Sequence, residues 1–253
     1  ETQNKLIESE KMASLGGLVT GIAHEINTPL GIGITSISHM KELLQKIKKQ
    51  KSSGLLTSSQ FDDFCVKCQE NIDIIQTSLQ HGAKLVNNFK MVSVTQSSGE
   101  LSEFKIKSCL QDALHNLDDN LKKNQHTIVL HCEDDLIISS YPDAFNLIIN
   151  NLVLNSIVHG FANIKQGQIE IRVSLSQGQL KLKYHDNGIG MDNHTTERVF
   201  EPFFTTKRGQ GSVGLGTHII YNLVVQRLHG NIHCTSEPGK GCTFTLLLPL
   251  EIG

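Results

Sequence analysis

Apolar residues recur at helical spacing along the first fifty positions of the chain. From Leu15 onward they fall within one sector, about 120° wide, of a helix that advances about 100° per residue. Their positions are 15, 18, 19, 22, 26, 30, 37, 40, 44 and 47. The pattern predicts one long amphipathic helix, and the polar run KKQKSSG at 48–54 predicts where that helix ends.

A second apolar series begins at Phe61, directly after TSSQ, a sequence that favours the start of a helix. Its members are spaced alternately by four and three residues, at positions 61, 65, 68, 72, 75, 79, 82, 86 and 89. Such a seam is typical of a coiled coil. Two helices joined by a short turn cannot cover both apolar stripes, so we expect a second copy to complete a homodimeric four-helix bundle.

Both cysteines of the CxxC motif lie on this second seam. Cys65 and Cys68 lack a second pair at the spacing of a zinc site, and the other four cysteines are dispersed. We therefore interpret both as small core residues. Dispersed thiols of this kind fit a reducing cytoplasm.

The period of the pattern changes at the turn-rich stretch VTQSSGE, residues 94–100. This change predicts a boundary between a first domain at 1–96 and a second at 97–253. Strands are expected near 102–106, 127–132, 137–141, 168–175, 179–185, 231–236 and 243–249, and helices near 108–123, 142–159 and from about 215. The expected fold is a helical hairpin followed by an α/β sandwich with helices on one face of a sheet.

Composition and charge narrow the possible partners. Apolar residues make up 38% of the chain, enough for packed cores, and 23 basic residues nearly balance 25 acidic ones. The overall charge gives no reason to expect nucleic acid as a partner. No apolar run approaches the roughly 18 residues that cross a bilayer. We expect a cytoplasmic location, with membrane attachment only through a segment not present here, because the chain begins with Glu1 rather than Met.

Polar chemistry interrupts the first helix at AHEINTPLG, residues 23–31. His24 points away from the predicted apolar sector. Glu25 is adjacent and could orient the imidazole, which would leave the other ring nitrogen free as a nucleophile. Thr28 could hold a water near that nitrogen, and Pro29 should bend the helix. The alternative interpretation is an ordinary solvated histidine.

Three sequence features of the second half point to a phosphate-bearing ligand. Asn151, Asn155 and His159 form a row at i, i+4 and i+8 on an otherwise apolar helix, and amide oxygens suit Mg²⁺. Asp186 opens a DNG turn directly after a strand, where a carboxylate can accept a hydrogen bond from an exocyclic amine. A glycine-rich run before the helix at about 215 could wrap phosphates with backbone N–H groups. A plain hairpin turn and amides that cap neighbouring loops are the alternatives.

Taken together, these motifs resemble the kinase core of bacterial sensor histidine kinases. HEINTPL is similar to the phosphoacceptor H box, NLVLN to the N box, DNGIGM to the first glycine box, FEPFFTTK to the F box and GLG to the second glycine box. All five occur in the order of the family, and the match covers nearly all of the chain. The sequences HEINTPLG and NSIVHGF are most similar to those of the nitrogen-regulator-like branch.

The resemblance implies a dimerisation and histidine phosphotransfer domain followed by a Bergerat-type ATP-binding domain, the fold of DNA gyrase and the heat-shock ATPase chaperones. It implies that His24 accepts the γ-phosphoryl group of ATP and passes it to an aspartate of a response regulator. Glu25 would assist the transfer, and Glu25 with Thr28 matches the E-x-x-T pattern of relatives that also dephosphorylate their regulator. Asn155 would bind Mg²⁺ with Asn151 as its companion.

The remaining motifs imply the nucleotide contacts. Asp186 would read adenine, and the nucleotide would be cradled by Gly188, Gly190, Gly214, Leu215 and Gly216. Val158 stands where many relatives have lysine, so we expect His159 or Lys207 to contact phosphate instead. Gly241-Cys242 replaces the usual G-T or G-S; a thiol is a weak donor, and the adjacent Thr243 is assigned to the adenine side.

Two other functions fit parts of the sequence. An ATPase or Ser/Thr kinase with the same nucleotide fold would explain residues 102–250 but would leave the polar face around His24 unused. A catalytically silent dimeric adaptor would need none of Asn155, Asp186 and GLG. A histidine kinase that uses ATP and Mg²⁺ accounts for all of them.

Overall fold

The computed structural model describes residues 2–94, 99–117, 121, 125–207 and 213–251. The chain divides into two compact units, Glu1–Lys90 and Met91–Gly253. The predicted domain boundary between residues 96 and 97 falls outside the described residues. None of the described helices is both long and apolar enough to cross a membrane.

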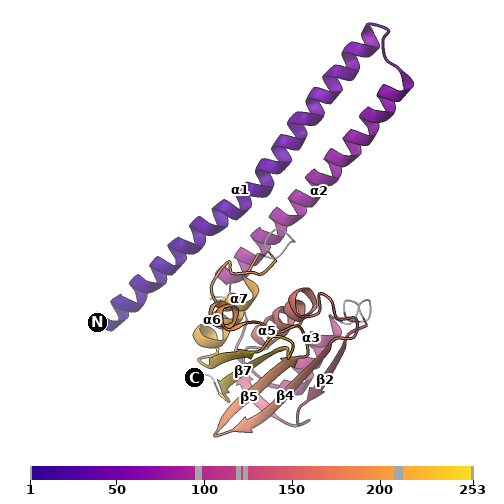
Figure 1. The fold of residues 1–253 in the computed structure, drawn as a ribbon. Helices are drawn as coiled ribbons and strands as arrows, with labels where there is room; N and C mark the ends of the chain where they lie inside the picture. The colour runs from indigo at the N-terminus through magenta and orange to yellow at the C-terminus, as the bar shows by residue number, and fades with distance from the viewer. Residues whose placement is uncertain (1, 95–98, 118–120, 122–124, 208–212, 252–253) are drawn as a thin grey trace. The chain divides into compact units, whose positions relative to one another are not determined.

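The first unit is a hairpin of two long helices, α1 (Thr2–Ser52) and α2 (Ser58–Val94) (Figure 1). α1 continues through Pro29 and ends within the polar run, as predicted. A reciprocal capping box begins α2: the Gln60 amide donates to the Thr57 hydroxyl at 3.3 Å, and the Thr57 amide donates to the Gln60 side chain at 3.0 Å. The TSSQ sequence thus fixes the start of α2.

The buried residues of the hairpin are mostly small or polar. Gly33, Ser36, Asn71 and Ser78 are buried, together with Leu85, and the Pro29 ring lies 3.8 Å from where Gly82 would carry a Cβ. The larger apolar residues of the predicted stripes remain exposed, namely Leu30, Ile37, Leu44, Phe61, Ile72, Leu79 and Val86. Leu79, for example, keeps 55% of its surface exposed. A single hairpin therefore covers only part of its apolar surface, as expected.

The register of this contact differs from the predicted one by one position at several points of α2. Cys68 is half-buried, but Cys65 is exposed, because the buried row runs through 71, 78 and 85 instead of 72, 79 and 86. Cys65 is therefore not part of the core of the single hairpin, and its burial in a dimer stays a prediction. Its side chain belongs to the exposed apolar stripe.

The second unit is a two-layer α/β sandwich. Its main sheet has the order β2-β4-β5-β7-β6, and a smaller sheet pairs β1 with β3. The strands are β1 (Ser102–Lys105), β2 (Thr127–His131), β3 (Ile137–Ser140), β4 (Gln168–Ser176), β5 (Gln179–Asp186), β6 (Asn231–Ser236) and β7 (Cys242–Pro249). β2 runs parallel to β4, and all other neighbours are antiparallel. Gln177 and Gly178, both with positive φ, form the two-residue turn between β4 and β5.

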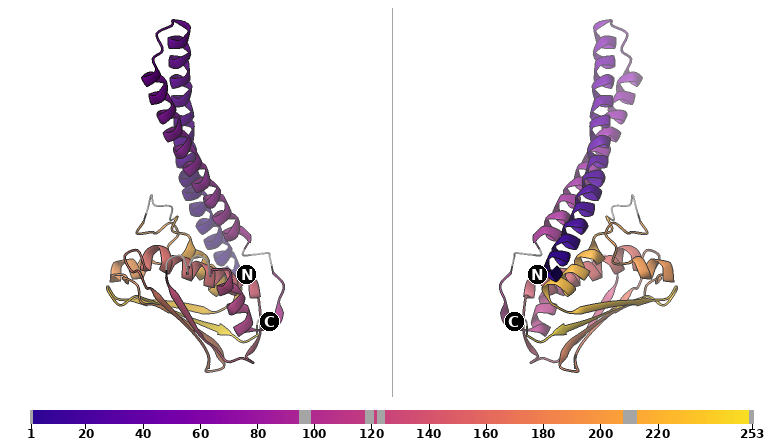
Figure 2. Two further views of the ribbon diagram at one scale, coloured as in Figure 1. Left: turned by 90° about the vertical axis from the view of Figure 1, so that its right-hand side faces the viewer. Right: turned by 90° about the vertical axis from the view of Figure 1, so that its left-hand side faces the viewer.

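Helices cover one face of the main sheet, as both views of Figure 2 show. They are α3 (Ile106–His115), α5 (Pro142–Asn155), α6 (Asn193–Arg198) and α7 (Gly216–Asn222), with π-helical turns η1 (Ser156–Gly160) and η2 (Leu223–Arg227) extending α5 and α7. The core lies between helices and sheet and includes Phe145, Ile148, Leu152, Ile171, Leu182, Tyr184, Ile220 and Leu246. The strand residues of this core point inward because side chains alternate along a strand, and the polar residues between them point outward.

The fold class is confirmed: a helical hairpin precedes an α/β sandwich with helices on one sheet face. Two predicted helices end earlier than expected. The helix near 108–123 is α3 and ends at His115, with part of the remaining range outside the described residues. The helix expected at 142–159 changes to a π-helical turn at Ser156, a distortion that is common at functional sites.

Candidate functional site

His24 is exposed on α1, about one turn before Pro29, which is buried. Thr28 donates its hydroxyl to the His24 carbonyl at 3.2 Å, and the buried Pro29 packs toward Gly82 of α2. Among the described residues, Glu25 makes no hydrogen bond to the imidazole. Adjacent residues on a helix point in different directions, so a role of Glu25 in orienting the ring needs a rotamer other than the one seen here.

The predicted asparagine pair converges on the start of α7. A Cβ added to Gly216 would lie 3.1 Å from Oδ1 of Asn151 and 3.3 Å from Oδ1 of Asn155. Nδ2 of Asn151 donates to the Leu147 carbonyl at 2.8 Å, which fixes this side chain. Nδ2 of Asn155 is buried without a partner. Two amide oxygens beside a glycine form a set of donors that fits Mg²⁺, and an orphaned amide marks a place for a polar ligand.

Asp186 lies at the centre of a buried polar network at the end of β5. Its Oδ2 accepts the hydroxyl of Ser156 at 2.7 Å, and its Oδ1 accepts the amides of Gly188 at 2.9 Å and Cys242 at 3.3 Å. The hydroxyl of Tyr184 lies 2.8 Å from Ser156 Oγ. Burial raises the pKa of Tyr184 well above its usual value, so this phenol stays protonated and can donate. The chain of donors fixes the carboxylate in one orientation.

The glycines of the two glycine boxes are required by close approach of the chain to itself. Gly190 has φ +68°, and a Cβ there would lie 2.0 Å from the Glu237 carbonyl. Gly214 has φ +72°, and a Cβ there would lie 2.6 Å from the Phe204 carbonyl. A Cβ at Gly188 would meet Asp186 at 2.8 Å. These three glycines shape the loops, whereas Gly216 also leaves space beside the asparagine oxygens.

Two basic side chains from different segments meet at the end of η1. Nδ1 of His159 lies 3.2 Å from the Thr206 hydroxyl, and the Lys207 ammonium group donates to the Val158 carbonyl. Burial, with a smaller contribution from Lys207, lowers the pKa of His159. The imidazole is therefore neutral at pH 7, and Lys207 is the cation at this edge of the site. Both residues that were expected to replace the missing lysine are brought together.

Thr243 lies on the wrong side of the sheet for the role predicted for it. Its hydroxyl is 3.0 Å from Nδ1 of His185, on the face that carries no helix. Successive residues of a strand point to opposite faces, and Cys242, the direct partner of Asp186 in the β5–β7 pair, points inward. Assignment of Thr243 to the adenine side is wrong. Cys242 occupies that position, with its Sγ 3.2 Å from Ser236 Oγ.

Leu215 and the start of α7 join the site to the F-box segment. The Leu215 side chain is fully buried, so only its backbone can reach a ligand. Nδ1 of the buried His218 donates to the Phe200 carbonyl at 3.1 Å, and its Nε2 accepts from Asn222 Nδ2 at 3.1 Å. Burial lowers the pKa of His218, and the Phe200 carbonyl opposes that shift only in part. A neutral histidine therefore ties together the segments that flank residues 205–215.

Sequence reasoning did not identify Ser156, Tyr184 and His218 as members of the site. A signal existed for the first two. Ser156 directly follows the second N-box asparagine, and Tyr184 precedes Asp186 by two positions and so shares its face of β5. The role of His218 depends on the course of residues 199–204, which the sequence pattern did not predict.

Residues 140–252 match the model of the histidine kinase-, DNA gyrase B- and HSP90-like ATPase family. That range contains the asparagine pair, Asp186 and the glycines of both glycine boxes. The α/β unit is therefore an ATPase-type nucleotide domain of this family.

The whole chain aligns with curated sensor kinases. It is 30% identical to the two-component sensor PprA of Pseudomonas aeruginosa over 98% of its length and 26% of PprA. It is 28% identical to the sensor histidine kinase ZraS of Escherichia coli over 99% of its length and 49% of ZraS. The chain spans less than half of either relative. The chain is thus similar to bacterial sensor histidine kinases over nearly its whole length, and its place in a nitrogen-regulator-like branch stays a prediction.

A solved structure shares the fold of both units. The histidine kinase ThkA, in a crystal structure with the response regulator protein TrrA, aligns with 96% of the chain and 64% of its own, with a TM-score of 0.65 at 19% identity. This similarity shows the order of the two folds along the chain. At that identity it assigns no residue a role.

Proposed function

We propose that the chain is the core of a kinase that phosphorylates His24 from ATP and passes the phosphoryl group to an aspartate of a response regulator. Residues 1–96 would form the dimerisation and phosphotransfer domain, and residues 97–253 the ATP-binding domain. One observation carries the proposal: the exposed His24 lies on one compact unit, and the cluster of Asn151, Asn155, Asp186 and Gly216, which we call the nucleotide cup, lies on the other. A nucleophile on a helical hairpin is of no use to a self-contained ATPase.

The cup supports binding of an adenine nucleotide. Asp186 keeps acceptor capacity on its carboxylate beyond the three hydrogen bonds it receives, since two oxygens offer about four lone-pair sites. An exocyclic amine is the donor that fits it. At the other end, Lys207 and the backbone at the start of α7 supply positive charge and N–H groups for phosphates.

Asn151 and Asn155 would hold Mg²⁺ through their amide oxygens, and Gly216 leaves the space between them open. The ion would neutralise charge on the phosphate oxygens. The protein's own contribution is position: Asn151 is fixed by its bond to Leu147, and both amides are anchored on α5.

The transfer step joins the imidazole of His24 to the γ-phosphorus. A neutral ring nitrogen attacks, the new N–P bond forms as the bond to the bridging oxygen breaks, and ADP leaves. The proton displaced from the imidazole passes to solvent or to Glu25, whose side chain is half-buried beside it. Positioning of the two units supplies most of the catalysis, because phosphoryl transfer needs little covalent help from the protein.

A second copy of the hairpin would cover the exposed stripe that includes Ile72, Leu79 and Val86. The proposed homodimer thus follows from uncovered apolar surface. A response regulator is the proposed acceptor, and the Glu25–Thr28 pair is the proposed element for removal of the phosphoryl group from that regulator.

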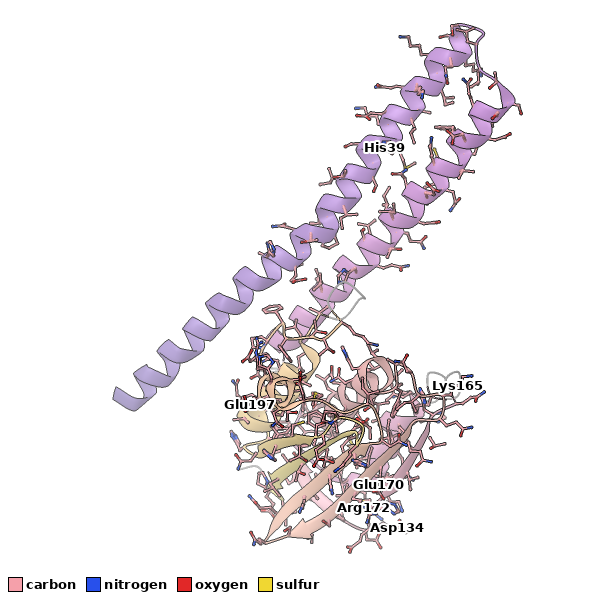
Figure 3. The ribbon with its side chains drawn as sticks, in the orientation of Figure 1. His39, Asp134, Lys165, Glu170, Arg172 and Glu197 are labelled. Atoms are coloured by element: carbon pink, nitrogen blue, oxygen red, sulfur yellow. The ribbon has the colours of Figure 1, made fainter. Side chains whose placement is uncertain are left out.

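Incubation with γ-³²P-labelled ATP and Mg²⁺ tests the proposal. His24→Gln should abolish labelling. His39→Gln is the matched control, because His39 is an exposed histidine on the same helix (Figure 3). Label that persists in His24→Gln would rule the proposal out.

Two further measurements separate the alternatives. Phosphohistidine is labile in acid and stable in alkali, whereas phosphoserine shows the reverse. A label that is lost in acid and kept in alkali would therefore exclude a Ser/Thr kinase. A titration that found no Mg²⁺-dependent ATP binding would favour the silent adaptor. Transfer of label to candidate receiver domains, followed over time, identifies the regulator.

A further inference from the structure

Arg227 contacts two separate segments of the second unit, the start of α5 and the chain at Gly99. Its Nη1 lies 3.1 Å from Oδ2 of Asp143 and its Nη2 lies 3.4 Å from Oδ1, a two-pronged ion pair. The same Nη2 donates to the Gly99 carbonyl at 3.4 Å, and the guanidinium stacks 4.4 Å from the centre of the Tyr141 ring. Its side chain is only 13% exposed. A planar guanidinium held on an aromatic ring and a carboxylate has one available orientation.

Gly99 is the first described residue after the boundary between the domains. It has φ +123°, a conformation that favours glycine, and a Cβ there would lie 2.4 Å from Oδ1 of Asp143 and 2.6 Å from Nη2 of Arg227. The chain therefore enters the nucleotide unit pressed against the ion pair. Any side chain at this position would push either the backbone or the pair aside.

Asp143 and Arg227 lie on the helices that also carry residues of the nucleotide site. Asp143 lies in the first turn of α5, where a negative charge is favoured, and α5 carries Asn151 and Asn155. Arg227 ends η2, the continuation of α7, which begins at Gly216. The point where the linker enters is thus connected to both helices that define the nucleotide site.

We propose that Arg227 and Asp143 form a clasp that fixes the direction in which the interdomain linker leaves the nucleotide unit, and that they are positioning residues for phosphoryl transfer to His24. This inference rests on the proposed function. The contacts described above for Arg227 and Asp143 do not involve Asn151, Asn155, Asp186 or Gly216, so loss of the clasp should leave ATP binding intact. What it should change is how often the γ-phosphate and the imidazole meet in a productive geometry.

The test uses the full chain with Arg227→Gln, Asp143→Asn and the double variant, and Arg172→Lys as a matched control. Arg172 also pairs with a carboxylate, Glu170 at 2.6 Å, but both residues lie on β4 of the main sheet (Figure 3). Gly99→Ala is a second route, because its Cβ would separate the linker from the ion pair without removing either charged group. Unfolding transitions first establish that each variant is folded.

Three readouts are expected in the clasp variants. Hydrogen exchange at the amides of residues 99–101 becomes faster, autophosphorylation slows roughly 10- to 100-fold, and the Kd for ATP stays within about twofold of its original value. The double variant should be no slower than the more affected single variant, since both substitutions break the same pair. Arg172→Lys should change none of the three.

Other results would overturn the clasp, its positioning role or the proposed function. Unchanged hydrogen exchange would overturn the clasp itself, and faster exchange with unchanged autophosphorylation would overturn its positioning role. If the original chain incorporated no label at His24, the proposed function would fail, and the clasp would be decided by the exchange data alone. A loss of ATP affinity equal to the loss of rate would show that the pair acts through the cup and would also overturn the inference.

Discussion

The Ser156 hydroxyl donates a 2.7 Å hydrogen bond to Oδ2 of Asp186, and both side chains are buried. The same Ser156 oxygen lies 2.8 Å from the Tyr184 hydroxyl, so one small residue connects a buried phenol to a buried carboxylate. Ser156 is the partner of the Tyr184 hydroxyl and of Oδ2 of Asp186, while Oδ1 of Asp186 accepts the amides of Gly188 and Cys242. The orientation of Asp186, and with it the proposed recognition of the base, therefore depends in part on Ser156.

Ser156→Ala should therefore weaken both folding and binding. A buried polar group left without a partner costs about 1–3 kcal/mol, and the free energy of unfolding should fall by at least that amount. The Kd for ATP should rise by roughly tenfold. Urea unfolding and calorimetric titration measure the two effects, and Ser174→Ala, on the exposed part of β4, is the control. An unchanged Kd would show that Asp186 holds its orientation without Ser156.

Asn155→Ala should separate stability from binding. The Nδ2 group of Asn155 is buried without a partner, so its removal should change the free energy of unfolding by no more than about 1 kcal/mol. Mg²⁺-dependent nucleotide binding should be lost, because one of the two amide oxygens beside Gly216 disappears. Titrations with and without the metal measure this difference. Strong destabilisation without loss of metal dependence would make Asn155 a structural residue.

His218 should make stability depend on pH. Burial lowers its pKa in the folded state, so the unfolded state binds a proton more readily and the contribution of His218 is fully present above the unfolded pKa of about 6.5. That contribution is lost as the pH falls from about 6.5 through the folded pKa. Urea unfolding across pH 5–8 should show a smaller acid loss in His218→Gln, whose amide can replace both hydrogen bonds. His126 and His159 shift in the same direction and set the common background.

The cysteines should differ sharply in reactivity. Burial raises the pKa of Cys242 to about 11 and the pKa values of Cys109 and Cys234 to about 12. These three thiols stay protonated at pH 8 and should react slowly with iodoacetamide, while the exposed Cys65 reacts first. Mass spectrometry of partially alkylated protein measures the order. Fast modification of Cys242 in the folded protein would contradict the packing around Asp186.

Ile72→Asp and Leu79→Asp should dissociate the proposed dimer. Each places a charge in the stripe that a second hairpin would cover. Thr77→Asp is the control, because Thr77 is exposed about 140° around the helix from Ile72. Sedimentation analysis reports the mass. A monomeric original chain, or a dimer in both stripe variants, would contradict the assignment of this stripe.

The sequence was sufficient for the elements and motifs because each depends on local spacing. The rows of Asn151 and Asn155, the DNG turn after β5 and the glycine before α7 are all fixed by neighbours within a few residues. What they approach is set by distant segments, and the structure brings Gly216 of α7 to the oxygens on α5. The family resemblance, not periodicity, predicted that convergence.

Errors arose where a shift of one residue changes the face of an element. Thr243 and Cys242 are adjacent, but only Cys242 pairs with Asp186 on the inner face of the sheet. In α2, residues 71, 78 and 85 are buried and 72, 79 and 86 are exposed. An apolar stripe this wide does not reveal which edge packs within the hairpin and which edge packs against another chain.

The residues buried in the hairpin are mostly small, and this determines how the hairpin is stabilised. Gly33, Ser36 and Ser78 bury little apolar area between α1 and α2, so one hairpin alone gains little free energy from closing. In the proposed dimer, most apolar burial comes from the encounter of two copies, and closing and pairing become one event. The melting temperature of this half should therefore climb with protein concentration, whereas that of the nucleotide unit should not.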